Sequence, residues 1–382
     1  MKKINVSLGK RSYPILIGRG LASEIGKYLK RLRAGKKVFI VTHQQVAVKS
    51  GLLRQVHKSL HRAGFETSNY ILPYGSEHDK SEQGLELLWK AMLHQDLDRS
   101  STALALGGGV VGDVAGFAAS TYMRGINLVH MPTTLLAQVD SAIGGKTAID
   151  LTGGKNIVGT FYQPKLVVSD LNALKSLPPA AFRDSFAEVI KYGIIRDPKL
   201  FSLLENKGLL LLTHAKEGAL TTEDFSLLEN IVFRCAKIKA SIVIKDEFET
   251  KGLRVILNYG HTFAHALEGV SGYRISHGEA VGLGMVLAGI LAQKLKLVDT
   301  DFVARQQKLI QEMGLSTSLK PYAKRFRLSW LKVRSFFRHD KKTVGGIVRF
   351  VLPTRLGQVK VVGIEGEKWY HVRDSFLALG VH

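Results

Sequence analysis

The chain has 382 residues, of which 45% are hydrophobic and 23% are charged, and this balance excludes a wholly disordered protein. Lysine and arginine number 54 against 32 aspartate and glutamate residues, so the formal net charge is +22. An excess of this size suits phosphate-bearing partners, a class that includes nucleic acid, acidic membranes and small anionic substrates. The length favours two domains, or one large α/β unit with an extension.

Compartment signals favour a cytoplasmic protein with no membrane partner. Cys235 is the one cysteine of the sequence and so forms no intrachain disulfide, which is typical of a reducing compartment. The N-terminal segment has too few consecutive apolar residues before Gly18 for a signal peptide. The longest apolar stretch, 280–292, is shorter than the roughly 20 residues that span a bilayer.

The first half of the chain alternates between apolar runs and amphipathic segments. Runs typical of strands occupy 36–42, 69–74, 101–109 (a strand that leads into a glycine loop) and 126–134. Segments 51–64 and 81–95 carry apolar residues at helical spacing. Strands that alternate with helices of this length predict a parallel sheet built from βαβ units.

The second half, from about Leu177, is mostly helical. Helix-period segments occupy 180–196, 222–244, 259–270 and 277–296, and strand signals return in 347–353 and 358–364. Two prolines, Pro178 and Pro179, interrupt regular structure between the halves. We therefore predict an α/β domain over residues 1–176 and a mostly α-helical domain over residues 177–382.

The positive charge is concentrated in two regions. Residues 1–62 contain fifteen lysines and arginines against one acidic residue, Glu24, and residues 320–349 contain ten against Asp340 alone. Both regions carry regularly spaced apolar residues, so we interpret them as basic faces of folded elements rather than disordered tails. The bias in residues 1–62 is interpreted as surface composition, and no nucleic-acid partner is predicted.

A glycine-rich loop is the strongest local motif. Residues 107–113 read GGGVVGD, directly after an apolar strand and before a helical segment. Glycines allow close approach of the backbone to a phosphate, and the helix start offers free N–H groups. The same run also suits a tight βα turn, and it departs from the usual G-x-G-x-x-G pattern. A polar loop at 73–80 is a second candidate, for ribose contacts.

A second constellation consists of potential metal ligands on helical segments. Glu188 and Lys191 are one turn apart, His261 and His265 are four residues apart, and His277 opens a further helix. A glutamate and two histidines from three helices could hold one Zn²⁺ and leave a position open for substrate. A structural role for each histidine remains the alternative, and the HxxxH pattern lacks the glutamate of H-E-x-x-H proteases.

A third set of polar residues is embedded in glycine-rich or apolar sequence, where a charge needs a partner that an anionic substrate could supply. Solvation at the surface is the other interpretation. The set comprises Arg124, Asp140, Lys146, Lys155, Asn156, Lys239, Arg254, Asn258, Lys341 and Lys342.

Together these motifs resemble the 3-dehydroquinate synthase family, part of the sugar-phosphate cyclase superfamily. The matching strings, in family order, are GGGVVGDVAGFAAS, PTTLLAQVDSAIGGKTAID, GGKNIVGTFYQPK, AEVIKYGII, LNYGHTFAHALE, HGEAVGLGM and HDKK. The resemblance implies an N-terminal NAD-binding α/β domain and a mostly helical metal-binding domain. It implies conversion of 3-deoxy-D-arabino-heptulosonate 7-phosphate to 3-dehydroquinate and phosphate, by transient oxidation with NAD, β-elimination, reduction and aldol closure in the shikimate pathway.

Site residues follow from the resemblance by position. It implies that Glu188, His261 and His277 bind Zn²⁺, with Co²⁺ as an alternative. The implied NAD contacts are Glu77, Lys80, Gly108, Gly109, Val110, Asp113, Thr133, Thr134 and Lys155. The implied substrate contacts are Arg124, Asp140, Lys146, Asn156, Lys191, Lys239, Arg254, Asn258, Lys341 and Lys342. The implied catalytic residues are Glu249, His265, Lys146 and Lys191, the first two in proton transfer. The partner is a small phosphorylated sugar acid, and a homodimer is implied.

Other functions stay open at this point. Related sugar-phosphate cyclases act on sedoheptulose 7-phosphate or glucose 6-phosphate, and metal-dependent polyol dehydrogenation is a further enzyme alternative. A basic nucleic-acid-binding protein would interleave aromatic residues with its cations, as residues 320–349 do, although helical core spacing explains those aromatics. Departures from the family pattern are Ala180-Ala181, Ser185-Phe186, Ala264, the extra Lys251 and His43-Gln44.

Overall fold

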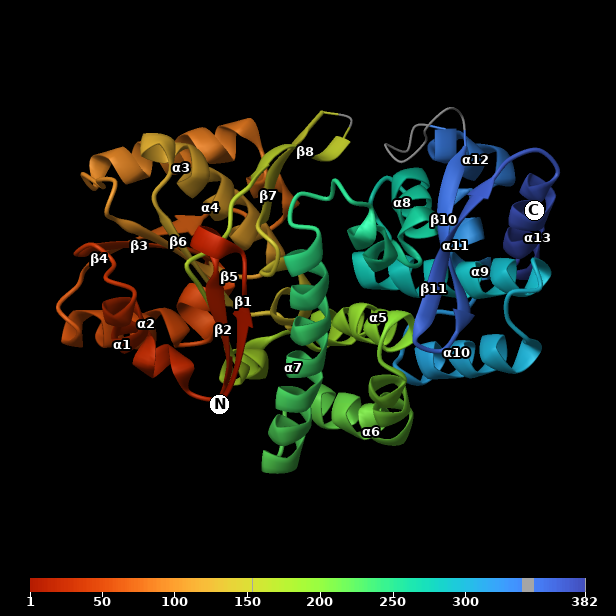
Figure 1. Ribbon diagram of the computed structural model, residues 1–382, viewed down its shortest axis with the longest axis horizontal. Coiled ribbons are helices and arrows are strands. Elements are labelled where there is room, and N and C mark those ends of the chain that lie inside the picture. The colour runs from red at the N-terminus through yellow and green to blue at the C-terminus, as the bar shows by residue number, and fades with distance from the viewer. Residues whose placement is uncertain (153, 339–346, 382) are drawn as a thin grey trace. The chain divides into compact units, whose positions relative to one another are not determined.

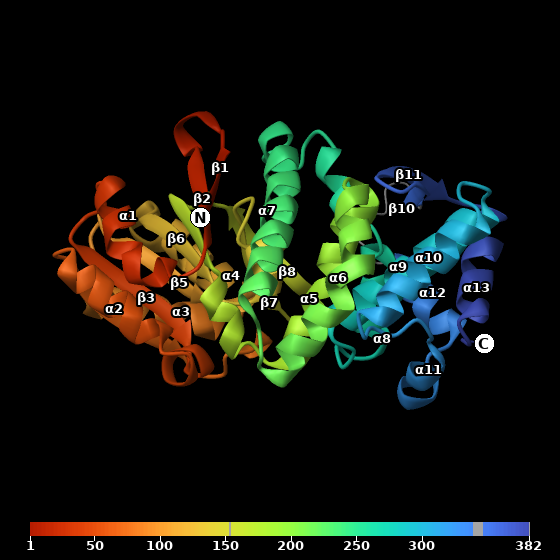
Figure 2. The ribbon, with the colours of Figure 1, turned by 90° about the horizontal axis from the view of Figure 1, so that it is seen from below.

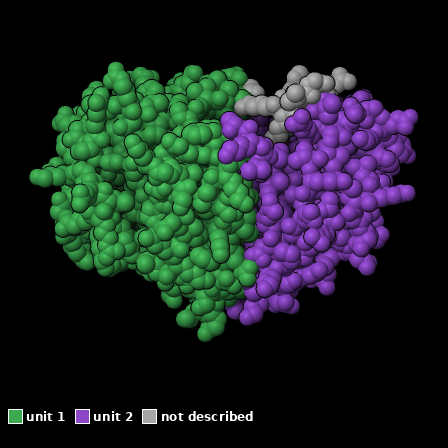
Figure 3. Space-filling view, in the orientation of Figure 1, with its two compact units in different colours: residues 1–178, 220–248 green, residues 179–219, 249–382 purple. Residues whose placement is uncertain are grey.

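The computed structural model describes residues 1–152, 154–338 and 347–381. Its contacts divide the chain into two compact units, which Figure 3 shows in different colours. Unit 1 comprises residues 1–178 and 220–248, and unit 2 comprises residues 179–219 and 249–382.

Among the described residues, unit 1 forms a seven-stranded sheet with the order β1-β2-β9-β6-β5-β3-β4. The strands are β1 (Lys2–Val6), β2 (Tyr13–Gly18), β3 (Lys37–His43), β4 (Glu66–Leu72), β5 (Thr102–Gly107), β6 (Asn127–Pro132) and β9 (Leu166–Asp170). β1 runs antiparallel to β2, and the remaining pairs of this sheet are parallel. The predicted α/β domain with a parallel sheet is confirmed.

Helices cover both faces of this sheet, as Figure 1 shows. The covering helices are α1 (Ile25–Arg31), α2 (Leu52–Arg62), α3 (Glu82–His94) and α4 (Gly109–Thr121). Val38 and Ile40 of β3 share a buried cluster with residues of α1 and α2, whereas Phe39 and Val41 share one with residues of α3 and α4. The period of two along the strand therefore divides the apolar side chains between two hydrophobic layers.

Helix α7 (Thr222–Lys245) differs from the predicted domain division. The sequence division places it in the second domain, but its contacts place residues 220–248 in unit 1, where α7 packs against β1. Its helical period was predicted correctly, and Leu228, Ile231 and Val232 lie on its buried face. Periodicity identifies a buried face without saying which neighbour covers it.

Unit 2 is mostly helical, as predicted, and Figure 2 shows α10 lying beside α9. Its longer helices are α5 (Pro179–Ile195), α6 (Pro198–Glu217), α8 (His261–Val270), α9 (His277–Lys294), α10 (Thr300–Glu312), α11 (Lys320–Phe326), α12 (Trp330–Arg338) and α13 (Lys368–Ala378). A two-stranded antiparallel hairpin, β10 (Val348–Arg355) and β11 (Gln358–Ile364), completes the unit. Helix α9 is buried along nearly all its length, from Gly278 to Ala292, which is typical of a central helix.

Aromatic side chains fill the core where α8, α12, α13 and β10 meet. Phe263 lies 4.8 Å from Phe350 and 5.7 Å from Phe376, measured between ring centroids. These contacts hold α8 firmly within unit 2, and α8 carries two of the predicted site histidines. Among the helices of the described residues, none combines the length and apolarity needed to cross a bilayer.

Candidate metal centre and cofactor loop

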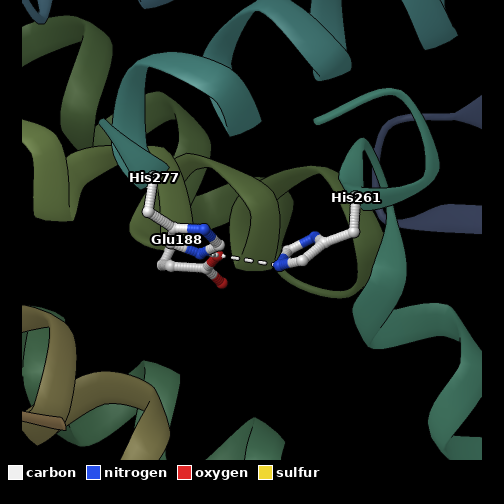
Figure 4. Close-up of side chains that lie close together, drawn as sticks. All are labelled: Glu188, His261 and His277. Atoms are coloured by element: carbon white, nitrogen blue, oxygen red, sulfur yellow. Dashed lines mark ion pairs between the residues drawn. The ribbon is translucent and has the colours of Figure 1, made fainter. Parts of the chain in front are cut away.

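Three predicted ligands converge in unit 2. Glu188 of α5, His261 of α8 and His277 of α9 each offer one ligand atom, and these atoms lie within 4.8 Å of one another. The Nε2 atoms of His261 and His277 lie 3.2 Å and 3.5 Å from Oε1 of Glu188. Figure 4 shows the three side chains pointing toward one another from separate helices. The spacing of these residues in the sequence did not show that their helices are neighbours, but the fold brings the helices together.

Two glycines allow the helices to approach so closely. A Cβ on Gly278, next to His277, would lie 2.3 Å from the carbonyl oxygen of Asp184 in α5. Gly260 precedes His261 with φ of +78°, and a Cβ there would lie 2.8 Å from the Cγ of Met285 in α9. A larger residue at either position would push apart the helices that carry the ligands.

Burial differs across the trio and leaves one side open. The side chain of Glu188 is 2% exposed, that of His261 is 13% exposed and that of His277 is 40% exposed. Lys191, also 2% exposed, pairs with the Glu188 carboxylate from the next turn of α5. A ligand bound to the trio could therefore be reached from the His277 side.

The electrostatics of the trio follow from this burial. Burial raises the pKa of the Glu188 carboxyl, but Lys191 and His261 outweigh that effect and hold the pKa well below its usual value. Burial lowers the pKa of the His261 imidazole. Burial also opposes protonation of His277, yet hydrogen bonds to Glu188 and Glu268 raise its pKa to about 10. Glu188 is thus a buried anion surrounded by nitrogen atoms.

The other predicted residues of unit 2 lie on or near the same elements. Arg254 and Asn258 belong to the short 3₁₀ helix η8 (Leu253–Asn258), which packs against α5. Arg254 is 2% exposed, and its Nε lies 3.8 Å from Oε1 of Glu249, a residue with the left-handed φ of 58°. His265 is exposed on α8, with its ring centroid 5.7 Å from that of His261. Lys341 and Lys342 lie outside the described residues.

In unit 1, predicted cofactor contacts gather around the buried cation of Lys80. Its Nζ lies 2.9 Å from Oδ2 of Asp113 and 3.5 Å from Oε1 of Glu77, and it donates a hydrogen bond to Oδ1 of Asn156. Lys155 also pairs with Glu77, at 3.6 Å. Burial lowers the pKa of Lys80, but Asp113 and Glu77 outweigh it, so the pKa is raised. Asn156, predicted as a substrate contact, lies in this cluster.

The glycine loop and the threonines after β6 also come together. The amide of Thr133 donates to the carbonyl of Gly107, and a Cβ on Gly108 would lie 3.1 Å from Cγ2 of Thr134. Gly109 and Val110 form the first turn of α4, whose N-terminal N–H groups have no partner within the helix. The loop has the close packing of a tight βα turn, and its half-buried helix start also offers the N–H groups of a phosphate site.

The remaining predicted residues of unit 1 are an ion pair, Lys239 with Asp140, and the exposed residues Arg124 and Lys146. Lys239 of α7 lies 2.7 Å from Oδ2 of Asp140 and also donates to its carbonyl at 2.8 Å. Arg124 is exposed after the end of α4 opposite the glycine loop, so the structure does not bring it to the Lys80 cluster. Lys146 is exposed at the start of β7 (Lys146–Leu151).

Sequence reasoning missed two acidic residues at these sites. Glu268 of α8 accepts from Nδ1 of His277 at 3.1 Å, and Asp150 of β7 lies 3.9 Å from Nζ of Lys80. Glu268 lies seven residues after His261, two helical turns along the same face, and that spacing is the signal that could have found it. Asp150 had no comparable signal, because its contact depends on the hairpin of β7 and β8 (Gly154–Phe161).

Comparison with solved structures finds the same fold in two synthases. The 2-epi-5-epi-valiolone synthase ValA from Streptomyces hygroscopicus subsp. jinggangensis 5008, solved with NAD⁺ and Zn²⁺ bound, matches with a TM-score of 0.84 and 24% identity over 98% of both chains. A 2-deoxy-scyllo-inosose synthase complexed with carbaglucose-6-phosphate, NAD⁺ and Co²⁺ matches with a TM-score of 0.81 and 22% identity, covering 98% of this chain and 99% of the other.

Sequence comparison identifies the family to which the chain belongs. The model of the 3-dehydroquinate synthase N-terminal region matches residues 69–184, and that of the C-terminal region matches residues 185–343. The 3-dehydroquinate synthase of Microcystis aeruginosa is 44% identical over 359 residues, 94% of this chain and 93% of that protein. The chain belongs to the 3-dehydroquinate synthase family, and the resemblance seen in the sequence motifs is confirmed.

Proposed function

We propose that this chain converts 3-deoxy-D-arabino-heptulosonate 7-phosphate into 3-dehydroquinate and phosphate, the reaction for which its relatives are named. The observation that carries the proposal is the convergence of Glu188, His261 and His277 in a chain 44% identical to a 3-dehydroquinate synthase over nearly its whole length. The enzyme would be a carbon–oxygen lyase that also closes a ring.

The trio fits a divalent metal ion, and we assign Glu188, His261 and His277 as ligands of Zn²⁺ or Co²⁺. Both carboxylate oxygens of Glu188 are buried, and the ammonium of Lys191 and the Nε2 atoms of both histidines lie around them. One buried carboxylate beside two imidazole nitrogens is a ligand set that suits zinc with an open position. When bound, the ion would polarise the substrate oxygen on the carbon that is oxidised.

The glycine loop and the Lys80 cluster are assigned to NAD. Gly108 and Gly109 leave room at the start of α4, where backbone N–H groups would hold the pyrophosphate. Glu77 would bind the ribose through its carboxylate, which is held in place by Lys80 and Lys155. NAD, when bound, would accept a hydride from the substrate and return it later in the same turnover.

The remaining predicted residues are assigned to the substrate. Arg254 and Asn258 of η8 would receive the substrate carboxylate, because guanidinium and amide donors match its two oxygens. Lys191, already paired with a carboxylate, would contact a substrate oxygen near the metal. We assign proton transfer to the imidazole of His265 and the carboxylate of Glu249, both on exposed residues. A homodimer and a cytoplasmic location remain predictions from the sequence.

The test is phosphate release from purified protein supplied with NAD⁺ and either Zn²⁺ or Co²⁺. We expect the heptulosonate 7-phosphate to release phosphate, with no net NADH, and chelation of the metal to stop the reaction. Glucose 6-phosphate and sedoheptulose 7-phosphate serve as comparison substrates. Turnover of either of these without turnover of the heptulosonate would assign a different cyclase, and stoichiometric NADH would indicate a polyol dehydrogenase.

A further inference from the structure

The two histidines of the trio are held in different ways at their second ring nitrogen. Nδ1 of His261 lies 3.1 Å from the carbonyl oxygen of Tyr259, whereas Nδ1 of His277 lies 3.1 Å from Oε1 of Glu268. A carbonyl and a carboxylate can only accept, so both Nδ1 atoms donate. Both rings therefore present Nε2 toward Glu188.

We propose that Glu268 is a positioning residue that fixes the His277 ring for metal binding and strengthens it as a ligand. The proposal rests on the metal assignment in the proposed function. Carboxylates that accept from the far nitrogen of a metal-bound histidine orient the ring and raise its basicity. Glu268 contacts the Nδ1 edge of the ring while Glu188 faces Nε2, so Glu268 lies on the side away from the ligand atoms.

Helix α8 places this carboxylate by its own geometry. Glu268 follows His261 by seven residues, or about 10.5 Å along the axis, and so returns to nearly the same face. Residue Glu268 is 9% exposed. Its backbone carbonyl accepts from the amide of Tyr273 at 2.7 Å and from Oγ of Ser271 at 2.9 Å, which fixes the end of the helix. One helix thus supplies a ligand and also the group that holds the ligand of the next helix.

His277 has the greater need of such a partner. Its side chain is 40% exposed, against 13% for His261, so surrounding atoms restrict its rotation less. It is also the first residue of α9, where the helix dipole disfavours an added positive charge. The negative charge of Glu268 at 3.1 Å opposes that effect. Because Lys191 already pairs with Glu188, the carboxylate of Glu268 adds negative charge beside the trio, which favours a bound cation.

A matched control is available in the first turn of α9. Glu279 lies two residues after His277, and its side chain is 13% exposed, close to the 11% of Glu268. Its carboxylate lies 3.3 Å from a guanidinium nitrogen of Arg183 and accepts from the amide of Ser316 at 2.9 Å. Substituting Glu279 therefore removes a carboxylate of similar burial from the same region without touching the His277 ring.

The experiment compares metal affinity in Glu268→Gln, Glu279→Gln and the unchanged protein. Each full-length protein is stripped of metal, and Zn²⁺ and Co²⁺ are titrated in competition with a chelator. We expect Glu268→Gln to bind both ions about 10–100-fold more weakly, as is usual when such a partner is lost. We expect Glu279→Gln to match the unchanged protein. The visible absorption of bound Co²⁺ should change in Glu268→Gln alone, because the ring geometry is altered.

Several outcomes would overturn the proposal. Equal affinity and an unchanged Co²⁺ spectrum in Glu268→Gln would do so, and so would equal losses in both variants. If Glu268→Gln does not fold without metal, Glu268→Asp is used in its place. The aspartate keeps the negative charge on a shorter side chain. Metal affinity equal to that of the unchanged protein would then count against a positioning role. Tight metal binding by the unchanged protein without phosphate release would refute the proposed function and leave this comparison standing.

Discussion

Each unit contains a cluster of charged side chains around one buried charge, which is a cation in unit 1 and an anion in unit 2. Lys80 of unit 1 is 3% exposed and Glu188 of unit 2 is 2% exposed. Lys80 is met by the carboxylates of Asp113 and Glu77 and by the amide oxygen of Asn156. The chain itself therefore supplies the partners of this cation.

Glu188 is surrounded differently. Its neighbours are Lys191 and two imidazole rings, whose Nε2 atoms lie 3.2 Å and 3.5 Å from one carboxylate oxygen. Burying a charge is costly unless it is both paired and hydrogen-bonded. Lys80 faces carboxylates of the chain alone, whereas Glu188 shares its surroundings with two imidazole nitrogens that could also bind a metal ion. This difference fits the two proposed roles, in which the Lys80 cluster positions Glu77 for NAD and the Glu188 cluster binds a metal ion.

His261→Ala removes one of the three ligands proposed for the metal ion, and it should have the largest effect. The ion's polarising effect is worth several kcal/mol, and about 4 kcal/mol corresponds to about a thousandfold in rate. We expect phosphate release to fall by about that factor and bound metal to be lost, while the circular dichroism spectrum is kept. His371→Ala, a histidine of α13 away from the trio, should leave both unchanged. Retention of metal and turnover in His261→Ala would refute the ligand assignment.

The next effect concerns stability rather than metal. Lys80→Met leaves Asp113 without its cation, while Glu77 keeps Lys155, and removing one partner of a buried pair costs about 3 kcal/mol. We expect urea unfolding to show this loss in the free energy of unfolding, with metal content unchanged. Lys90→Met is the control, because its pair with Glu86 is exposed and should contribute below about 0.5 kcal/mol. Equal stability of the two variants would remove the contrast between the clusters.

The sequence predicted the helices and strands better than it predicted which of them pack against one another. The strand at 36–42 and the helix at 277–296 correspond to β3 and α9, because each has the apolar pattern of a buried element. Helix α7 was predicted as a helix but assigned to the other domain, since amphipathicity does not name the surface it packs against. The hairpin of β7 and β8 was missed, because its glycines weaken the strand pattern.

The proposed metal site was also predicted only in part from the sequence. Glu188, His261 and His277 were predicted from residue type and spacing, and the structure brings them together. Glu268 was missed because one glutamate in a helix is usually a solvated residue, and its role depends on where α9 begins. Contacts between elements distant in sequence are set by packing, which residue patterns do not encode.

His130 is a third buried titratable group, and unlike Lys80 and Glu188 its side chain is neutral, because burial disfavours the protonated imidazole. It lies in β6, is 6% exposed and lines a small cavity with Gly108 and Gly112 of the glycine loop. Burial lowers the pKa of His130 from 6.5 to about 4. The unfolded chain therefore takes up a proton at higher pH than the folded one, so its contribution to stability is lost as pH falls from about 6.5 toward 4.

The smallest predicted effect follows from this shift. At pH 5 the unfavourable linkage amounts to about 2 kcal/mol, from about 1.5 pH units at 1.36 kcal/mol each. We expect His130→Gln to lose less unfolding free energy than the unchanged protein between pH 7.5 and pH 5, by about that amount in urea titrations. His94→Gln, on an exposed residue of α3, should follow the unchanged protein. Because carboxylates titrate alike in all three proteins, a pH dependence common to all three would show that His130 is hydrated and protonates freely in the folded state.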